Sequence, residues 1–357
     1  MPPVEDFNYT ALNHQAGGHH NKKGVRCMLT DDKGNVLKSI NDSQSGKNEE
    51  IFYNRVFSDE YFNEFCQFLP RFYGGKTVVA DLKYSYLKLE NLLANFAYPN
   101  IMDIKLGRVT YDPFASMEKK IKEEGKFNAQ TKIGFRISGM KLYNEESNCY
   151  YSIDGRGFRS CTCYSTDEDK VAAYLKIFLG YKDLHNNMSR NVVNSSCADC
   201  CHQHQLATHA LLQKVINFLK ILLKYMENEK RINLFSSSIF IAYDSMKFYE
   251  LSHCSLHQHG GCFNNCLNNT AISMLSHCCH EKINKLSVKS NLFTNVPKKF
   301  VASLYNKVDY CSSIRMIDFG HSFIDMEPNA LDENYIFGLK GLLSFLERLT
   351  IFDSDKL

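Results

Sequence analysis

The sequence lacks the features of a membrane-bound or secreted protein. The most apolar stretch, Leu211 to Met226, is interrupted by lysines at 214, 220 and 224, so no segment approaches the ~20 uncharged residues of a spanning helix. The first residues, Met-Pro-Pro-Val-Glu-Asp, contain neither the basic region nor the apolar core of a signal peptide. We therefore expect no membrane span and a chain that folds in the cytoplasm or nucleus.

A strong charge of either sign is also lacking. The chain has 42 basic and 39 acidic residues, and 42 − 39 gives +3. This balance excludes a polybasic nucleic-acid binder and an acidic disordered tail. Internal repeats, G-x-G-x-x-G and P-loop sequences are absent too, so the two commonest phosphate-binding loops are excluded. What remains is a globular chain of 357 residues with 44% apolar side chains, enough for two domains or one two-lobed unit.

The order of predicted elements is typical of an α+β fold, with strands first and a mixed part later. We expect a hairpin over 25–40, a helix over 49–69, and strands at 76–81, 84–90 and 101–106. Further along we expect a short charged helix at 116–127, strands at 133–143, 233–243 and 313–321, and helices at 206–227 and 332–349.

Two distant segments carry a kinase-like pattern. Met316–His321 ends an apolar strand with Asp-Phe-Gly, the tripeptide with which protein kinases hold Mg²⁺. Lys38 lies on a hairpin strand before a helix, and kinases pair such a lysine with a helix glutamate, here Glu49 or Glu50. Each residue alone has a simpler explanation, a turn-capping aspartate or a solvated lysine. Their joint order favours a site for a nucleotide phosphate.

A third segment adds charges of both signs. Asp103 and Lys105 project from one face of a predicted strand, about 7 Å apart. Directed into a cleft, they suit a phosphorylated ligand, and a surface ion pair is the alternative. Downstream, one helical face carries lysines at i, i+3 and i+7, namely Lys119, Lys122 and Lys126. These repel one another unless an anion or water screens them, so a solvated helix face is the other explanation.

Residues 99–107 read Pro-Asn-Ile-Met-Asp-Ile-Lys-Leu-Gly. This Pro-x-x-x-Asp-x-Lys-x-Gly pattern resembles the signature of the inositol polyphosphate kinase family. Further similarities run from about residue 12 to 350, and the run from Thr110 to Ser116 looks like the multikinase branch of that family. The other matching segments are His14–His19, Ser237–Phe240, Ile317–His321 and Leu331–Lys340.

The resemblance implies a two-lobed, protein-kinase-like α+β fold with ATP in the cleft between the lobes. It divides the chain into an N-terminal lobe, residues 1–92, with the ATP-binding sheet and a helix, and a C-terminal lobe, residues 93–357. The second lobe would contain the substrate-binding helix at 116–127. The implied cofactors are ATP and Mg²⁺, and the implied substrate is a small inositol polyphosphate. We expect a monomer.

The resemblance also assigns roles residue by residue. Lys38 would bind the phosphates of ATP, and the backbone of Glu90, Asn91 and Leu92 would bind its adenine. Asp103 would bind the ribose hydroxyl groups, although the chemistry of a carboxylate would also allow it to act as a base. Asp318 would ligate Mg²⁺, and Lys105 would bridge the substrate and the transferred group. The catalytic set is thus Lys105, Asp318 and Asp103, and the inositol phosphate would contact Lys105, Lys119, Lys122, Lys126 and His321.

Three departures from the family pattern concern the substrate end. Lys122 and Glu123 stand where the multikinase branch tends to have glutamines. We expect Lys122 to strengthen phosphate binding and Glu123 to weaken it. Gly320 replaces the usual alanine and should loosen the chain beside His321.

Cysteine and histidine gather in two segments that are insertions relative to the family. Eight of the 14 cysteines lie between Cys197 and Cys279, in expected loops near 185–205 and 250–295. In a reducing compartment, cysteines so placed are thiols or metal ligands rather than disulfides. Structural zinc is therefore one hypothesis, although the spacings match no known finger.

The sequence thus predicts an ATP- and Mg²⁺-dependent kinase that phosphorylates inositol tris- and tetrakisphosphates, of the multikinase type. Within the family, the alternatives are an inositol hexakisphosphate kinase and an inositol trisphosphate 3-kinase. From another class, the alternative is a catalytically weak scaffold whose Cys/His insertions bind zinc.

Overall fold

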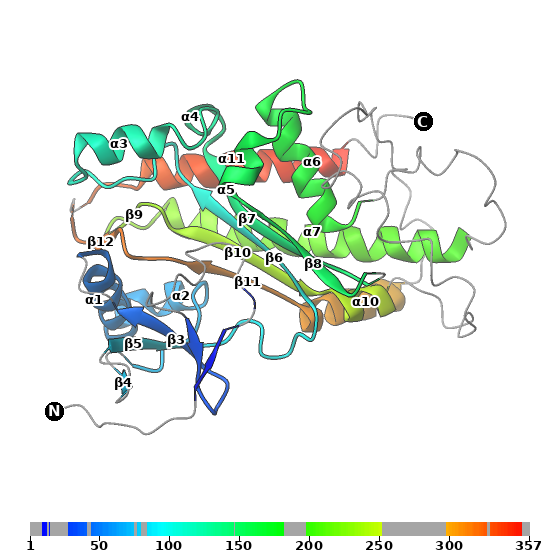
Figure 1. Ribbon diagram of the computed structural model, residues 1–357, viewed down its shortest axis with the longest axis horizontal. Helices are drawn as coiled ribbons and strands as arrows, with labels where there is room; N and C mark the ends of the chain where they lie inside the picture. The colour runs from blue at the N-terminus through cyan, green and yellow to red at the C-terminus, as the bar shows by residue number, and fades with distance from the viewer. Residues whose placement is uncertain are drawn as a thin grey trace.

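Two five-stranded antiparallel sheets organise the chain (Figure 1). The computed structural model describes residues 9–12, 14, 28–40, 44–74, 77–79, 84–145, 147–181, 198–251, 298–326 and 329–351. The predicted α+β class is confirmed. The predicted limits of the lobes, at residues 92 and 93, stay a prediction, and they fall in the connection between the two sheets.

The smaller sheet has the strand order β1-β2-β3-β5-β4. Its strands are β1 (Thr10–Ala11), β2 (Leu29–Thr30), β3 (Val36–Ile40), β4 (Thr77–Val79) and β5 (Tyr84–Leu89). The predicted hairpin is β2 and β3, and Asp31 closes its turn because Oδ1 accepts the N–H groups of Lys33 and Asn35 at 3.0 and 2.7 Å. The alternation along β3 buries Leu37 completely and directs Lys38 to the other face.

The larger sheet has the order β11-β10-β6-β7-β8. Its strands are β6 (Pro99–Leu106), β7 (Phe135–Asn144), β8 (Cys149–Asp154), β10 (Ser238–Asp244) and β11 (Ser312–Ile317). The central strand β6 is the one that carries Asp103 and Lys105. Its pairing with β7 shifts between Asp103 and Ile104, and such an irregularity re-aims side chains beside functional sites. A two-stranded ribbon joins β9 (Ile232–Leu234) to β12 (Ser322–Ile324).

Helices cover the larger sheet and fill the space between the sheets. They are α1 (Gln44–Ser58), the 3-10 turn η1 (Glu60–Phe62), α2 (Asn63–Cys66), α3 (Met117–Glu124), α4 (Gln130–Ile133), α5 (Gly155–Ser160), α6 (Asp167–Leu179), α7 (Ala198–Met226), α8 (Ser245–Leu251), α10 (Lys298–Cys311) and α11 (Glu333–Ile351). Within α7, His204–Met226 is long and apolar enough to cross a membrane by length and composition alone. Its apolar side packs against α10 and α11, which accounts for that composition.

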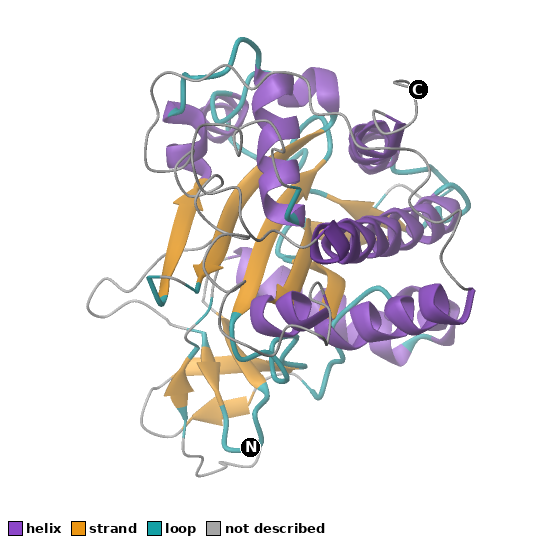
Figure 2. Cartoon of the chain, turned by 90° about the vertical axis from the view of Figure 1, so that its right-hand side faces the viewer, coloured by secondary structure: helices purple, strands orange, loops and turns teal. Residues whose placement is uncertain are grey.

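The smaller sheet lies at one end of the molecule (Figures 1 and 2), and α1 connects it to the rest. This helix contacts both β3 and β12. The Phe52 ring of α1 stacks on Phe319 with the ring centroids 4.4 Å apart, and both side chains are fully buried. A single hydrophobic core therefore continues from α1 and β5 into the larger sheet.

The last helix crosses the substrate end of β6 at very short range. A Cβ on Gly338 would lie 2.4 Å from the Gly107 nitrogen and 2.7 Å from the Gly134 oxygen. Gly107 itself has φ +102°, a conformation that favours glycine. This close approach explains why the Pro-x-x-x-Asp-x-Lys-x-Gly pattern ends in glycine.

Three sequence predictions about elements are wrong. Residues 233–243 form two strands in different sheets, β9 and β10, because Ser236 adopts a left-handed conformation between them. The helix predicted over 49–69 is α1, η1 and α2 in succession, since the chain turns at Asp59. The loop expected near 185–205 is helical from Ala198 onward. The remainder of that loop and most of the loop at 250–295 lie outside the described residues.

Candidate active site

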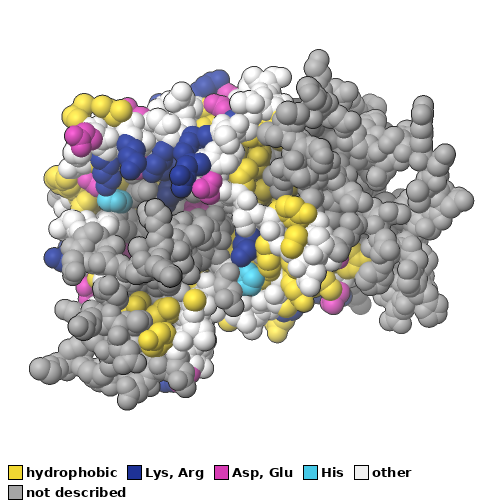
Figure 3. All heavy atoms as spheres, viewed as in Figure 1, with side chains coloured by type: hydrophobic (Ala, Val, Ile, Leu, Met, Phe, Trp, Pro, Cys, Tyr) yellow, Lys and Arg dark blue, Asp and Glu magenta, His cyan; other side chains and the backbone are white. Residues whose placement is uncertain are grey.

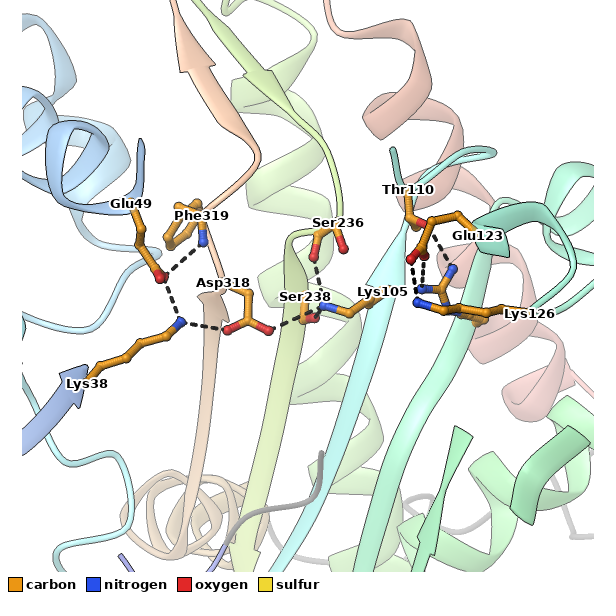
Figure 4. Close-up of polar contacts among 11 residues, drawn as sticks. Lys38, Glu49, Lys105, Thr110, Glu123, Lys126, Ser236, Ser238, Asp318 and Phe319 are labelled. Atoms are coloured by element: carbon orange, nitrogen blue, oxygen red, sulfur yellow. Dashed lines mark hydrogen bonds and ion pairs between the residues drawn. The ribbon is translucent and has the colours of Figure 1, made fainter. Parts of the chain in front are cut away.

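Three charged side chains from three distant segments meet where the two sheets approach each other (Figure 4). Lys38 Nζ of β3 lies 2.8 Å from Asp318 Oδ1, and Lys105 Nζ of β6 lies 3.3 Å from Asp318 Oδ2. Lys38 also lies 2.7 Å from Glu49 Oε1 of α1. The structure therefore brings together the predicted lysines and the predicted aspartate, and it identifies Glu49 as the helix glutamate.

Backbone geometry places Asp318 at this meeting point. β11 ends at Ile317, and Asp318 follows in a left-handed conformation with φ +65°. Aspartate tolerates this region better than most residues, yet such a conformation persists only where the surroundings fix it. Here the next N–H group, that of Phe319, donates to Glu49 Oε1 at 3.1 Å. The Phe319 ring then inserts against α1, so the chain direction after Asp318 is fixed from both sides.

Lys105 has a second set of contacts that holds its ammonium toward Asp318. Its Nζ donates to the Ser236 carbonyl at 2.8 Å and to Ser238 Oγ at 3.1 Å. Ser236 supplies that carbonyl from the turn between β9 and β10, the same turn that the sequence predicted as continuous strand. These contacts hold the Lys105 ammonium group in a fixed position, unlike that of a flexible surface lysine.

The charges of the three groups stabilise one another. Partial removal from water would raise the pKa of Asp318, but the two ammonium groups outweigh it and hold that pKa well below its usual value. Burial would lower the pKa of Lys38, yet Asp318 and Glu49 raise it above its usual value. At neutral pH Asp318 is thus ionised and Lys38 is protonated.

Asp103 lies on the same face with a different electrostatic state. Burial raises its pKa; the positive charge of Lys105 opposes this, and the negative charge of Asp318 adds to it. Its Oδ1 has no hydrogen-bond partner among the residues that the structure describes. A buried acceptor without a partner is costly, and a ligand hydroxyl group or a cation would satisfy it. This geometry suits the ribose role that the resemblance assigns, while the role itself stays a prediction.

The predicted substrate end is built around His321. Its Nδ1 lies 2.7 Å from Asp112 Oδ2 and its Nε2 lies 3.3 Å from Lys119 Nζ. Burial, followed by the charge of Lys119, lowers the pKa of His321. We therefore assign a neutral ring that donates from Nδ1 to the Asp112 carboxylate, which leaves Nε2 to accept from the Lys119 ammonium. The sequence analysis did not identify Asp112, because no local sequence pattern indicates that it contacts His321.

Glu123 holds the end of the substrate helix in place. Its Oε2 accepts hydrogen bonds from Thr110 Oγ1 at 3.1 Å and from Arg136 Nη2 at 3.2 Å, while Lys126 pairs with Oε1. Arg136 is buried and also donates to Gln130 at 2.6 Å. The negative charge of Glu123 is thus matched by two cations within the protein. Sequence reasoning treated it as an opposing charge and missed this cluster.

The three predicted substrate lysines differ in their surroundings. Lys119 and Lys126 are half-buried and face His321 and Glu123, whereas Lys122 is exposed and its side chain forms no hydrogen bond or ion pair with any described residue. Figure 3 shows lysine and arginine side chains gathered in a band at α3, beside a histidine. The helix therefore supplies a positive surface next to the Lys105–Asp318 pair.

The predicted hinge follows β5 directly. The Glu90 N–H donates to the Arg71 carbonyl at 2.8 Å, and Asn91 Oδ1 accepts the Leu93 N–H at 3.0 Å. The side chain of Asn91 therefore stabilises its own turn. Within the described part of the chain, the Leu92 N–H has no hydrogen-bond partner. It is one backbone donor of this segment that a ligand could use, which suits the adenine role and leaves that role a prediction.

The third departure from the family pattern, Gly320, has a structural reason. A Cβ at Gly320 would lie 2.9 Å from the carbonyl oxygen of Ser45, closer than real contacts allow. The absence of a side chain lets the first turn of α1 approach the chain beside His321. The structure thus shows tight packing at Gly320 where the sequence led us to expect a looser chain.

The fold and these residues define a class. The family model of inositol polyphosphate kinases matches residues 86–347, a range that includes the central sheet, the α3 lysines, Asp318 and His321. The chain belongs to the inositol polyphosphate kinase family.

Several individual proteins of this family are similar to the chain. The chain is 27% identical to an inositol polyphosphate multikinase of Homo sapiens, over 95% of this chain and 88% of that protein. It is 25% identical to the human inositol hexakisphosphate kinase 1, over 74% of this chain and 53% of that protein. The crystal structure of an S. cerevisiae inositol phosphate multikinase with ADP and Mn²⁺ superposes with a TM-score of 0.53 and 23% identity, covering 88% of this chain and 98% of that one. This likeness confirms the kinase-like fold.

Proposed function

We propose that this protein is an ATP-dependent inositol polyphosphate multikinase. It transfers the γ-phosphoryl group of ATP to hydroxyl groups of inositol tris- and tetrakisphosphates, toward the pentakisphosphate. The observation that carries the proposal is the Lys38–Asp318–Lys105 centre beside the lysine-bearing helix α3. The multikinase relative that aligns with almost the whole chain supports this branch of the family.

The ATP end of the site fits a nucleotide with a divalent cation. Asp318 supplies a carboxylate, and Mg²⁺ is usually held by one or two carboxylates plus phosphate oxygens. The Asp103 carboxylate, whose Oδ1 has no partner among the described residues, is left for the ribose. When bound, the cation neutralises charge on the phosphates. Asp318 would hold it, Lys38 would contact the phosphates, and the Leu92 N–H would orient the adenine.

The acceptor end fits a multiply phosphorylated ring. Lys105 reaches toward Asp318, Lys119 contacts His321, and Lys126 pairs with Glu123. His321, neutral at physiological pH, adds a polar contact without a further charge. Phosphoryl transfer of this kind depends on positioning and on charge stabilisation more than on proton transfer. The fixed ammonium of Lys105 can stabilise the group in transit between donor and acceptor.

A product profile tests the proposal. The purified chain is incubated with Mg-ATP and either inositol 1,4,5-trisphosphate or inositol hexakisphosphate, and the products are resolved by anion-exchange chromatography. Tetrakis- and pentakisphosphate made from the first substrate alone would support the multikinase assignment. Pyrophosphates made from the second would move the protein to the hexakisphosphate kinase branch, and a product profile that stops at one tetrakisphosphate would indicate a trisphosphate 3-kinase.

Two variants make that experiment specific. Asp318→Asn should abolish all products, because it removes the carboxylate between the two lysines. Lys132→Gln should behave as wild type, because Lys132 pairs with Glu168 on the surface and its side chain is 78% exposed. Absence of products from both substrates would refute the proposed function. A monomeric state, residence in the cytoplasm or nucleus, and zinc in the Cys/His segments stay predictions.

A further inference from the structure

A second charged cluster lies at the far end of α1, away from the predicted ligands. Asp325 follows β12 in a left-handed conformation with φ +59°. Its Oδ1 accepts from Arg231 Nε at 2.7 Å, and its Oδ2 accepts from Arg231 Nη2 at 3.2 Å and from Arg55 Nη2. Its N–H donates to the Arg231 carbonyl at 2.7 Å. One strained residue thus joins the last turn of α1 to the chain before β9.

Arg231 is fixed independently of Asp325. Its Nη2 lies 3.2 Å from Asp59 Oδ2, and its guanidinium carbon lies 4.5 Å from the Tyr61 ring centroid. Asp59 and Tyr61 come directly after α1. Planar guanidinium groups suit this combination of a two-point contact with a carboxylate and stacking on a ring. Arg231 therefore connects the end of α1 to Asp325, as Arg55 does.

The opposite part of α1 carries the residue that the active site uses. Glu49 precedes Arg55 by six residues, about 9 Å along a helix axis. It contacts Lys38 and the Phe319 N–H, and Phe52, between the two, stacks on Phe319. The helix is thus attached at three points to one segment, residues 318–325, which begins with the predicted metal ligand.

We infer that Asp325 is a positioning residue: it fixes α1 along its axis so that Glu49 stays against Lys38 and the Phe319 N–H group. The inference rests on the proposed kinase function. Loss of Asp325 would leave the stacked Phe52 and Phe319 rings as a pivot, about which the Glu49 end of the helix can shift. Shifts of about 1 Å in a supporting element change catalysis strongly.

Because the cluster is partly exposed, its effect on the active site can be measured separately from its effect on the stability of the fold. The side chains of Asp325, Arg231 and Arg55 are 31%, 28% and 46% exposed. Ion pairs of such exposure contribute little to the stability of the fold. The hydrophobic contacts of α1 remain when the cluster is broken. Its removal should therefore alter the site while the fold persists.

The test compares Asp325→Asn with wild type in steady-state kinetics at varied ATP. We expect the KM for ATP to rise and kcat to fall, so that kcat/KM decreases about 5- to 10-fold, with a thermal midpoint within about 4 °C of wild type. Arg55→Met, which breaks the contact from the helix side, should show the same pattern and serves if the first variant folds poorly. Lys132→Gln, which breaks an unrelated surface pair, should change neither quantity.

A double-mutant cycle shows whether the effect passes through Glu49. In a Glu49→Gln background, Asp325→Asn should reduce kcat/KM by less than about 2-fold, because the contact that it positions is already lost. The same 5- to 10-fold decrease in both backgrounds would overturn the inference. An active wild type with an unaffected Asp325→Asn variant would overturn it as well. An inactive wild type would instead refute the proposed function.

Discussion

Replacing Glu123 by glutamine tests the cluster that holds the substrate helix. The change keeps the shape of the side chain and removes one charge. Arg136, whose side chain is 7% exposed, would then keep only neutral acceptors, Thr110 and Gln130. A buried guanidinium without a charged partner is poorly compensated for its lost hydration. The variant should therefore fold less stably than the wild type.

The magnitude follows from the burial of both partners. Removing one partner of a fully buried ion pair costs about 3–5 kcal/mol. The Glu123 side chain is 13% exposed, and Arg136 retains two neutral hydrogen bonds, so we expect a loss of about 2 kcal/mol. Urea unfolding measures it as a lower midpoint with an unchanged slope. Glu118→Gln, on the exposed side of α3, should stay within about 0.5 kcal/mol of wild type.

The same variant separates two explanations of substrate binding. If Glu123 positions Lys126, the KM for inositol trisphosphate should rise about 3-fold in Glu123→Gln, although the site gains positive charge. If Glu123 merely repels phosphate, as its charge alone suggested, that KM should fall. Unchanged stability together with a lower KM would refute the reasoning from the cluster.

Three further outcomes are expected. Gly338→Ala should destabilise the fold by at least about 2 kcal/mol or prevent soluble expression, because the added Cβ would clash with two backbone atoms. Gly125→Ala, at φ −69°, should be tolerated in the same expression and unfolding assay. Lys119→Ala should raise the KM for inositol trisphosphate about 10-fold, and Lys122→Ala less than about 3-fold; equal effects would show that α3 presents both to the substrate. His321 has a lowered pKa in the folded state, so the stability that its neutral form contributes is present above its unfolded pKa of about 6.5 and is lost as the pH falls below that value. His321→Asn should make the unfolding midpoint less dependent on pH between 7.5 and 5.5, and an unchanged pH dependence would contradict this assignment.

Much of the site could be predicted because its residues lie on regular elements or directly after them. A strand lysine, a helix glutamate and an aspartate after an apolar strand have a fixed spatial relation in a two-lobed kinase, so Lys38 and Asp318 were placed together across 280 residues. Choosing between Glu49 and Glu50 required knowing which side of α1 faces Lys38. These neighbours point about 100° apart on a helix, and α1 begins at Gln44, before any clear periodicity.

The supporting contacts could not be predicted for a different reason. Asp112, Arg136 and Asp325 act on partners that are 209, 13 and 94 or more residues away, and no local pattern marks such pairs. The turn at Ser236 was missed because the serines at 236–238 lie between two apolar runs, Leu234–Phe235 and Ile239–Ile241, which together resemble one strand. A left-handed serine leaves no signature in composition, whereas the glycine at position 107 was visible in the motif.

The central claim is that the Lys38–Asp318–Lys105 centre transfers a phosphoryl group from ATP to an inositol polyphosphate. The most direct test measures label transfer from γ-labelled ATP to inositol 1,4,5-trisphosphate by wild type and by Asp318→Asn, at equal concentrations of folded protein. We predict transfer by the wild type and a loss of at least about 10³-fold in the variant. Equal transfer by both proteins, or none by either, would contradict the account.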